Sequence, residues 1–206
     1  MLEQNQIPYE FVISCYPKSG QKLYYIDSRD LDYTYKIRVS EFPAWVADRV
    51  ESSESEYSFF TVGHSHGGWM SLQVALNLGQ DVDMVGVMTL DPISRLKCKT
   101  PFTANLANLN VLSRISMNYV NECLQAPSDI SPEEYQYISD RAFLFSNYYQ
   151  VTAPYLHSSE ILGAENYLVD DPVGGVFDTF GPHVRIDTNE DAWQQFDANV
   201  LGEFGM

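Results

Sequence analysis

The amino-acid sequence predicts an α/β protein with a mostly parallel sheet flanked by helices, and three observations support this prediction. Short apolar or β-branched runs alternate along the chain with segments of helical periodicity, as in βαβ units. The run 57–62 leads through a glycine-rich turn into a long apolar segment and then into a second apolar run, 83–91. With 45 % hydrophobic residues among 206, the chain can fill the core of one domain. We therefore predict a single domain over 1–206, with 93–141 as a candidate cap or insertion region.

The N-terminal segments predict strands followed by a helix. Residues 9–16 and 22–28 are β-branched and aromatic runs separated by the turn-rich sequence PKSGQ, so they form either a hairpin or two parallel strands whose connecting helix has been lost. Residues 33–39 predict a third, edge-like strand. Ser40 is a good N-cap for the helix that follows, and Pro43 is tolerated in its first turn. That helix places four apolar residues on one face, Phe42, Trp45, Val46 and Val50.

The central segment predicts one right-handed βαβ unit. The strand 57–62 is almost wholly apolar, as expected when both faces of a parallel sheet are covered. From His66 a helix runs to Gly79, which closes it, and apolar side chains surround this helix almost completely. The strand 83–91 is stopped by Pro92. Strand, tight turn, helix and strand together form the right-handed crossover of parallel sheets.

The rest of the chain predicts further helices and strands. Helical signals are mixed over 92–141 and include the sequence SPEEYQYISDRA, whereas 142–151 has the composition of a strand. Thr188 is placed to cap a C-terminal helix that carries Trp193, Phe196 and Val200 at helical spacing.

The charge of the chain excludes some classes of partner. A formal net charge of −16 repels nucleic acid and anionic lipid surfaces, so a polyanion-binding role is not expected. The N-terminus lacks the basic start and apolar core of a signal peptide, and no apolar run approaches the ~18 residues of a transmembrane helix. We accordingly expect no transmembrane segment and, by default, a cytoplasmic location.

Three cysteines leave the redox compartment open. Cys15 lies in an apolar run and is most simply a buried thiol. Cys98 and Cys123 lie in one long connecting region and form either two free thiols or a disulfide, which would indicate an extracytoplasmic protein. The spacing of the cysteines fits no zinc pattern.

The sequence GHSHG at 63–67 matches the pattern Gly-x-Ser-x-Gly, and it lies between the apolar strand and the apolar helix. A serine on such a strand-to-helix turn stands at the carboxyl edge of the sheet, where it can act as a nucleophile. Glycines at 63 and 67 remove side chains that would collide as the strand doubles back. The helix N-terminus directs backbone N–H groups at the site, so the His66 amide is a predicted oxyanion donor. Ser65 is the candidate nucleophile.

A nucleophilic serine needs a base, and the chain contains four histidines. His64 and His66 flank Ser65 on a tight turn and point elsewhere. We expect His64 to pack under this strand-to-helix turn or bind substrate, and His66 to line the pocket. His183 lies on a loop before the C-terminal helix and is the predicted base. His157 is predicted to be structural or to contact the substrate.

Asp91 is the predicted acid, because it ends the strand that directly follows the helix after Ser65. Neighbouring parallel strands end side by side, which brings Asp91 close to Ser65, and Pro92 is expected to keep Asp91 extended. The alternative is an aspartate that caps the following loop. Asp170 and Asp171 are then the second choice, since the acid can also come from a later strand.

Several segments resemble one family. VGHSHGG resembles the nucleophile elbow of triacylglycerol lipases, and TLDPIS resembles the pancreatic-lipase arrangement in which the acid follows the strand after the elbow. SNYYQ, SSEILGAEN and GPHVRI resemble segments near the C-terminus of bacterial lipase-like proteins. The chain is thus similar to the α/β-hydrolase superfamily over roughly 57–92 and 145–200. The resemblance implies a compact, N-terminally trimmed hydrolase fold with Ser65 as nucleophile, Asp91 as acid and His183 as base.

This resemblance implies hydrolysis of a small-molecule or lipid ester through an acyl-enzyme, with no metal or organic cofactor. Lipases usually take a second oxyanion donor from an early His-Gly, which is absent here, so Tyr16 or Lys18 is the best substitute. Five apolar residues predict either a wall for an acyl chain or a satellite core, Phe102, Leu106, Leu109, Leu112 and Ile115. Two alternatives are a non-catalytic binding module on the same fold, and a metal site on His64 and His66, which supply only two ligands.

Overall fold

The computed structural model describes residues 11–14, 23–27, 30–37, 40–52, 58–94, 96–98, 122–154, 156–171 and 180–203. Four strands form a parallel sheet in the order of the chain, β4 (Ser58–His64), β5 (Asp83–Leu90), β6 (Leu144–Tyr149) and β7 (Glu165–Leu168). Flanked by helices, this sheet confirms the predicted α/β class.

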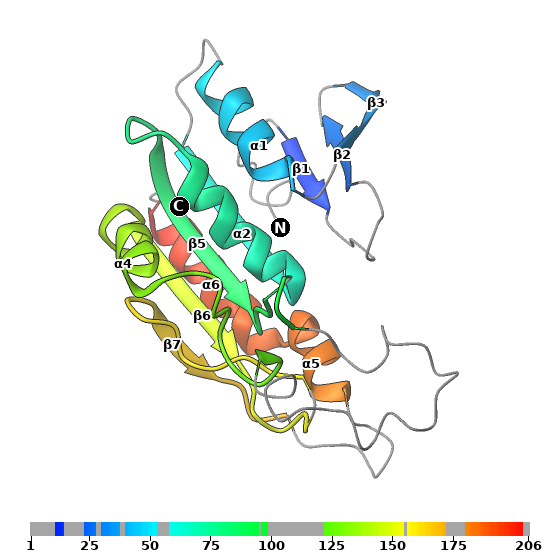
Figure 1. Ribbon diagram of the computed structural model, residues 1–206, viewed down its shortest axis with the longest axis vertical. Helices are drawn as coiled ribbons and strands as arrows, with labels where there is room; N and C mark the ends of the chain where they lie inside the picture. The colour runs from blue at the N-terminus through cyan, green and yellow to red at the C-terminus, as the bar shows by residue number, and fades with distance from the viewer. Residues whose placement is uncertain are drawn as a thin grey trace.

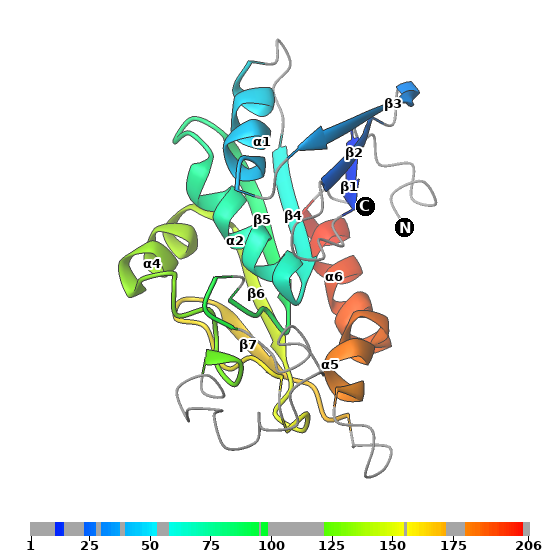
Figure 2. The ribbon, with the colours of Figure 1, turned by 45° about the vertical axis from the view of Figure 1, so that its right-hand side comes forward.

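Helices cover both faces of the parallel sheet. Figure 2 shows α1 (Phe42–Glu51), α2 (His66–Asn77) and α4 (Pro132–Arg141) on one side and α6 (Glu190–Glu203) on the other. The short helix α5 (Gly181–Arg185) and the 3₁₀ helix η2 (Ile186–Thr188) lead into α6, and α5 lies beyond the arrowhead of β5 (Figure 1). Helix α2 connects the adjacent parallel strands β4 and β5, as predicted.

The two faces of the sheet hold separate apolar clusters. The larger cluster joins α1, α2 and α4 to one face, and Leu72, Ala75 and Ile138 within it have no exposed surface. The smaller cluster joins β5 and β6 to the α6 side and includes Met88 and Ala192. Burial on both faces explains why β5 is apolar almost throughout its length.

The N-terminal strands form a separate antiparallel sheet, again in chain order, from β1 (Phe11–Ser14), β2 (Leu23–Asp27) and β3 (Asp30–Ile37). Of the two arrangements left open for the first pair, the hairpin is therefore the one adopted. β3 begins earlier than predicted, and it is an edge strand of this sheet, as expected.

Two predicted N-caps are replaced by their neighbours. Helix α1 begins after Glu41, whose side chain makes no capping hydrogen bond, rather than after Ser40. At the start of α6, the Asn189 side chain accepts a hydrogen bond from the Ala192 amide at 2.9 Å. Thr188 belongs to η2, and its hydroxyl donates to the Arg185 carbonyl.

Helix α2 ends differently from the prediction that Gly79 closes it. Leu78 is already extended, with ψ 135°, so Gly79 lies outside the helix. The Arg141 guanidinium donates to the Leu78 carbonyl at 2.9 Å and also to the Gly79 carbonyl, while Glu51 accepts the Gly79 amide at 2.6 Å. Side chains from α1 and α4 thus satisfy the polar groups at this helix end.

The chain between β5 and β6 is described as far as Cys98 and again from 122 onwards. Helix α4 begins with a capping box, in which Ser131 and Glu134 each accept the other's backbone amide. The residues predicted as an acyl wall or satellite core lie outside the described residues, as does Cys15; they are Phe102, Leu106, Leu109, Leu112 and Ile115.

Candidate active site

Ser65 occupies a strained turn between β4 and α2. Its backbone has φ 58° and ψ −125°, which non-glycine residues adopt rarely. A Cβ on Gly63 would lie 2.1 Å from the Gly67 carbonyl oxygen, so only glycine fits before the turn. The Ser65 amide donates to the Leu90 carbonyl at 2.9 Å, and the Ile93 amide donates to the Ser65 carbonyl at 3.1 Å. These bonds fix Ser65 at the carboxyl ends of β4 and β5.

The second glycine that the turn requires is not the one predicted. A Cβ on Gly67 would meet no described atom within 4 Å, whereas a Cβ on Gly68 would lie 2.8 Å from Pro92 Cβ. The close approach at this end of α2 is therefore made to the loop after β5, not within the elbow itself. Gly68 lets the first turn of α2 lie against the residue that follows Asp91.

Three side chains from distant parts of the chain form a continuous hydrogen-bonded series. Ser65 Oγ lies 2.8 Å from His183 Nε2, and His183 Nδ1 lies 2.7 Å from Asp91 Oδ2. Nδ1 faces a carboxylate and so carries the ring proton, which leaves Nε2 to accept the Ser65 hydroxyl. His183 is 3 % exposed and Asp91 0 %. The structure thus brings together the residues predicted as nucleophile, base and acid.

Asp91 follows β5 directly but is not extended. Its φ is 46°, so the prediction that Pro92 keeps it extended is wrong; aspartate tolerates this left-handed region better than most residues. Ser65 and Asp91 are the two non-glycine residues with positive φ among those described. The Asp91 amide donates to the Tyr148 carbonyl at 2.6 Å, which binds the turn to β6.

Both oxygens of the buried Asp91 carboxylate accept hydrogen bonds. Oδ1 accepts the Ser158 amide at 2.5 Å, and Oδ2 accepts Gln150 Nε2 at 2.6 Å as well as His183. A buried charge is tolerated only when such donors compensate it. Sequence reasoning does not find either supporting residue, because Gln150 is uncharged and Ser158 contributes a backbone amide that no pattern marks.

His183 lies within helix α5, not on a loop as predicted. This helix has only five residues and a Pro182 in its first turn, which gives too little helical periodicity to recognise. The His183 carbonyl accepts a hydrogen bond from His64 Nε2 at 2.7 Å. A residue of the elbow therefore contacts the backbone of the predicted base.

The His64 side chain packs against His183 and bonds to its backbone. The centroids of the two imidazole rings are 4.9 Å apart, and His64 Nδ1 lies 3.6 Å from Asp187 Oδ2. Burial lowers the pKa of His64, and the neighbouring His183 lowers it further. The substrate contact predicted for His64 stays a prediction.

The two remaining histidines bond to backbone carbonyls. His66 Nδ1 lies 3.2 Å from the Ile93 carbonyl, and His66 is also the first residue of α2. His157 Nδ1 lies 2.7 Å from the Ser158 carbonyl, next to the amide that binds Asp91. The pocket role of His66 and the substrate contact of His157 stay predictions.

The second-choice acids are not directed at His183. Asp171 Oδ2 instead accepts Arg185 Nε at 2.9 Å, and Asp170 is exposed. The predicted second oxyanion donors, Tyr16 and Lys18, lie outside the described residues.

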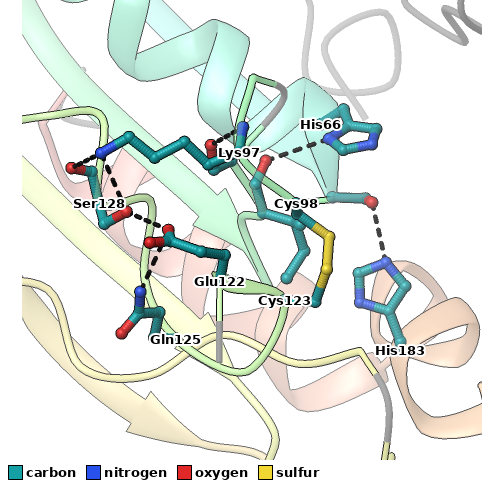
Figure 3. The surroundings of a disulfide bond; sticks show 11 residues. His66, Lys97, Cys98, Glu122, Cys123, Gln125, Ser128 and His183 are labelled. Carbon is teal, nitrogen blue, oxygen red and sulfur yellow. Dashed lines mark hydrogen bonds between the residues drawn. A yellow bond between two sulfur atoms is a disulfide. The ribbon is translucent and has the colours of Figure 1, made fainter. Parts of the chain in front are cut away.

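Cys98 and Cys123 form a disulfide, which is one of the two states that the sequence leaves open. Figure 3 shows this disulfide with His66 and His183 on one side of it. The Cys123 carbonyl accepts the His157 amide at 3.0 Å. The disulfide therefore joins the loop after Asp91 to a segment that is bonded to the chain next to Ser158.

A polar network lies on the other side of the disulfide in Figure 3. Lys97 Nζ donates to the Ser128 carbonyl at 2.8 Å, and the Ser128 hydroxyl donates to Glu122. The network and the disulfide together fix the two ends of the region that the structure leaves undescribed between 98 and 122.

Among the described residues, no helix has both the length and the apolarity needed to cross a membrane. The same residues contain no group of three or more His, Cys, Asp or Glu side chains that could bind a metal ion. Comparisons of the chain with protein-family models, curated proteins and solved structures find no match. Function must therefore be inferred from the site itself.

Proposed function

We propose that this chain is a serine hydrolase of the α/β-hydrolase type, which cleaves carboxylic esters through an acyl-enzyme on Ser65. The observation that supports it best is the hydrogen-bonded series from Ser65 Oγ through His183 to Asp91, with distances of 2.8 and 2.7 Å. These residue types recur in this geometry on unrelated folds, because a serine needs a base and the base needs an orienting acid. The strained turn of Ser65 between a strand and a helix adds support.

In the first half of the reaction, Ser65 Oγ attacks the ester carbonyl carbon while His183 Nε2 takes the hydroxyl proton. Asp91 keeps the imidazole oriented and stabilises the imidazolium that forms. The intermediate collapses when His183 gives its proton to the alkoxide oxygen and the alcohol leaves. Water then attacks the acyl-enzyme with His183 as base, and the acid leaves as the proton returns to Ser65.

The start of α2 is suited to stabilise the negative oxygen of each intermediate. Helix α2 has 12 residues, and the N–H groups of its first turn place partial positive charge beside Ser65. The His66 amide is the first of these groups. Removal of one such donor typically costs about 10²–10³-fold in rate.

The charge of the chain disfavours anionic substrates. A net charge of −16 repels anionic esters and surfaces of anionic lipid. The substrate class that we propose is therefore a small-molecule or lipid ester without negative charge.

Labelling with a fluorophosphonate tests the proposal. The wild type should be labelled at Ser65 and should hydrolyse p-nitrophenyl esters. Ser65→Ala should abolish labelling and lower kcat on the order of 10⁶-fold, because no other group can form the acyl-enzyme. Esters of graded chain length then separate an esterase from a lipase.

Ser131 offers a matched control, because it too directly precedes a helix, where its hydroxyl accepts the Glu134 amide. Ser131→Ala should keep full labelling and lose about 1 kcal/mol of unfolding free energy. A folded wild type that is not labelled would overturn the proposal and favour the non-catalytic binding module.

A further inference from the structure

Gln150 contacts the site but has no part in the reaction steps above. It follows β6 and is 0 % exposed. Its Nε2 donates to Asp91 Oδ2 at 2.6 Å and to the Leu156 carbonyl at 3.1 Å. Its Oε1 accepts the amides of Thr152 at 2.9 Å and Ala153 at 2.8 Å. Both donors and the acceptor of the carboxamide are therefore engaged.

These partners determine which end of the carboxamide faces Asp91. A backbone amide can only donate, so the atom bound to the amides of Thr152 and Ala153 must be the oxygen. The NH₂ group of Gln150 therefore faces Asp91. A donor fixed in this way requires an acceptor opposite it, which the Asp91 carboxylate supplies.

Two hydrogen bonds hold the Asp91 carboxylate in addition to the one from His183. Gln150 Nε2 binds Oδ2, and the Ser158 amide binds Oδ1 at 2.5 Å. Rotation of the carboxylate would break both bonds, and both donors come from the chain after β6. The oxygen that accepts Gln150 is the same one that accepts His183 Nδ1 at 2.7 Å.

We infer that Gln150 is a positioning residue of the proposed reaction, which keeps Asp91 Oδ2 in line with His183 Nδ1. This inference rests on the proposed function. Gln150 acts on Ser65 through Asp91 and His183. A misplacement of ~1 Å in such a series can cost about 10²-fold in rate.

Gln150→Glu is the direct test, because it turns the facing donor into an acceptor and keeps the shape. The oxygen that accepts Thr152 and Ala153 is retained. Two facing buried carboxylates repel when both are ionised, so the pair binds a proton as the pH falls. We expect kcat/KM to fall about 10²-fold at mildly alkaline pH, and the loss to shrink on acidification as the shared proton restores a donor to Asp91.

Gln136→Glu is the matched control. Gln136 Nε2 also donates to an aspartate, Asp140 Oδ1 at 2.7 Å, but this pair is exposed on α4. The control should match the wild type at every pH. Ionisation of a buried glutamate also destabilises the fold as the pH rises, so circular dichroism at each pH must show Gln150→Glu to be folded. In folded protein, a loss that changes with pH indicates positioning, and a loss that does not change with pH indicates packing alone.

A second readout does not depend on activity. In protein with ¹⁵N-labelled histidine, the ring nitrogens of His183 report by NMR which of them carries the proton. The wild type and Gln136→Glu should show the same Nδ1–H signal, and Gln150→Glu should shift this signal at alkaline pH, because a displaced Asp91 changes the hydrogen bond of Nδ1. If circular dichroism shows that Gln150→Glu does not fold, Gln150→Met removes the donor without adding charge and should perturb the same signal.

The two proposals fail separately. An unlabelled, folded wild type overturns the proposed function. If the wild type is labelled, two results would overturn the role of Gln150 alone. Gln150→Glu could match Gln136→Glu in activity, or its loss of activity could be independent of pH with an unchanged His183 signal.

Discussion

The turns that carry Ser65 and Asp91 end neighbouring strands and share a positive φ, 58° and 46°, yet different parts of the chain stabilise them. The turn at Ser65 depends on a glycine two residues before it, which admits the helix backbone. The turn at Asp91 depends on Gln150 and Ser158, which lie 59 and 67 residues away in sequence.

This difference shows where the information for a strained residue resides. Distant backbone groups of Leu90 and Ile93 also bind Ser65, but its turn needs a nearby glycine as well. That glycine leaves a short pattern in the sequence, from which the strained turn at Ser65 is predicted. A turn stabilised by distant partners leaves none, and Asp91 was predicted to be extended. Three experiments test this contrast, and a fourth tests the residue that packs against His183.

Asp91→Asn should have the largest effect, a fall in kcat of about 10⁴-fold, because the carboxylate that orients His183 is lost. Asp171→Asn is the control: Asp171 was the second choice for the acid but pairs with the half-exposed Arg185. Steady-state kinetics on folded variants measures both. A larger loss in Asp171→Asn would show that the acid is assigned to the wrong turn.

Gly63→Ala should lower the unfolding free energy by about 3 kcal/mol or more, because the new Cβ would lie 2.1 Å from a backbone oxygen. Gly67→Ala places its Cβ in open space within α2 and should be neutral, or stabilising by up to about 1 kcal/mol. Urea unfolding compares the two. Similar losses in both would contradict the steric account of the first turn.

Replacement of both Cys98 and Cys123 by serine should cost about 3 kcal/mol, since the bond closes a loop with a sequence separation of 25. The loss is read from urea unfolding of the oxidised wild type and the double variant. The rate at which the fluorophosphonate labels Ser65 also tests the turn at Asp91. Unchanged labelling would show that the disulfide stabilises the fold without contributing to the position of Asp91.

His64→Gln should have the smallest effect, visible as a change in how stability varies with pH. Because the pKa of His64 is lowered in the folded protein, the unfolded chain takes up the proton first as the pH falls below about 6.5. Stability should therefore be lost on acidification, by at most about 1.4 kcal/mol per pH unit, and the variant should lack this component. Equal acid dependence of wild type and variant in urea unfolding would contradict it.

The parallel sheet could be predicted because β5 is apolar almost throughout its length and α2 is largely apolar, as burial requires. β7 could not be predicted, because its four mostly exposed residues are too few to show an alternating pattern. Helix boundaries were wrong where tertiary contacts decide them, as at the end of α2, where Arg141 binds the carbonyls of the two residues that follow the helix.

The site could be predicted as far as its side chains follow from topology. Ser65 has a local motif, Asp91 follows from the adjacency of parallel strands, and His183 follows from the small number of histidines. Gln150 is a neutral residue after a strand, and its importance appears only when its distance to Asp91 is known.

The hydrogen bond from the Ser158 amide to Asp91 Oδ1 also makes the site observable in the absence of substrate. That amide belongs to a fully buried residue and can exchange its hydrogen with solvent only when the segment separates from the carboxylate. In deuterated water, the decay of a single backbone signal would therefore time the spontaneous opening of the site.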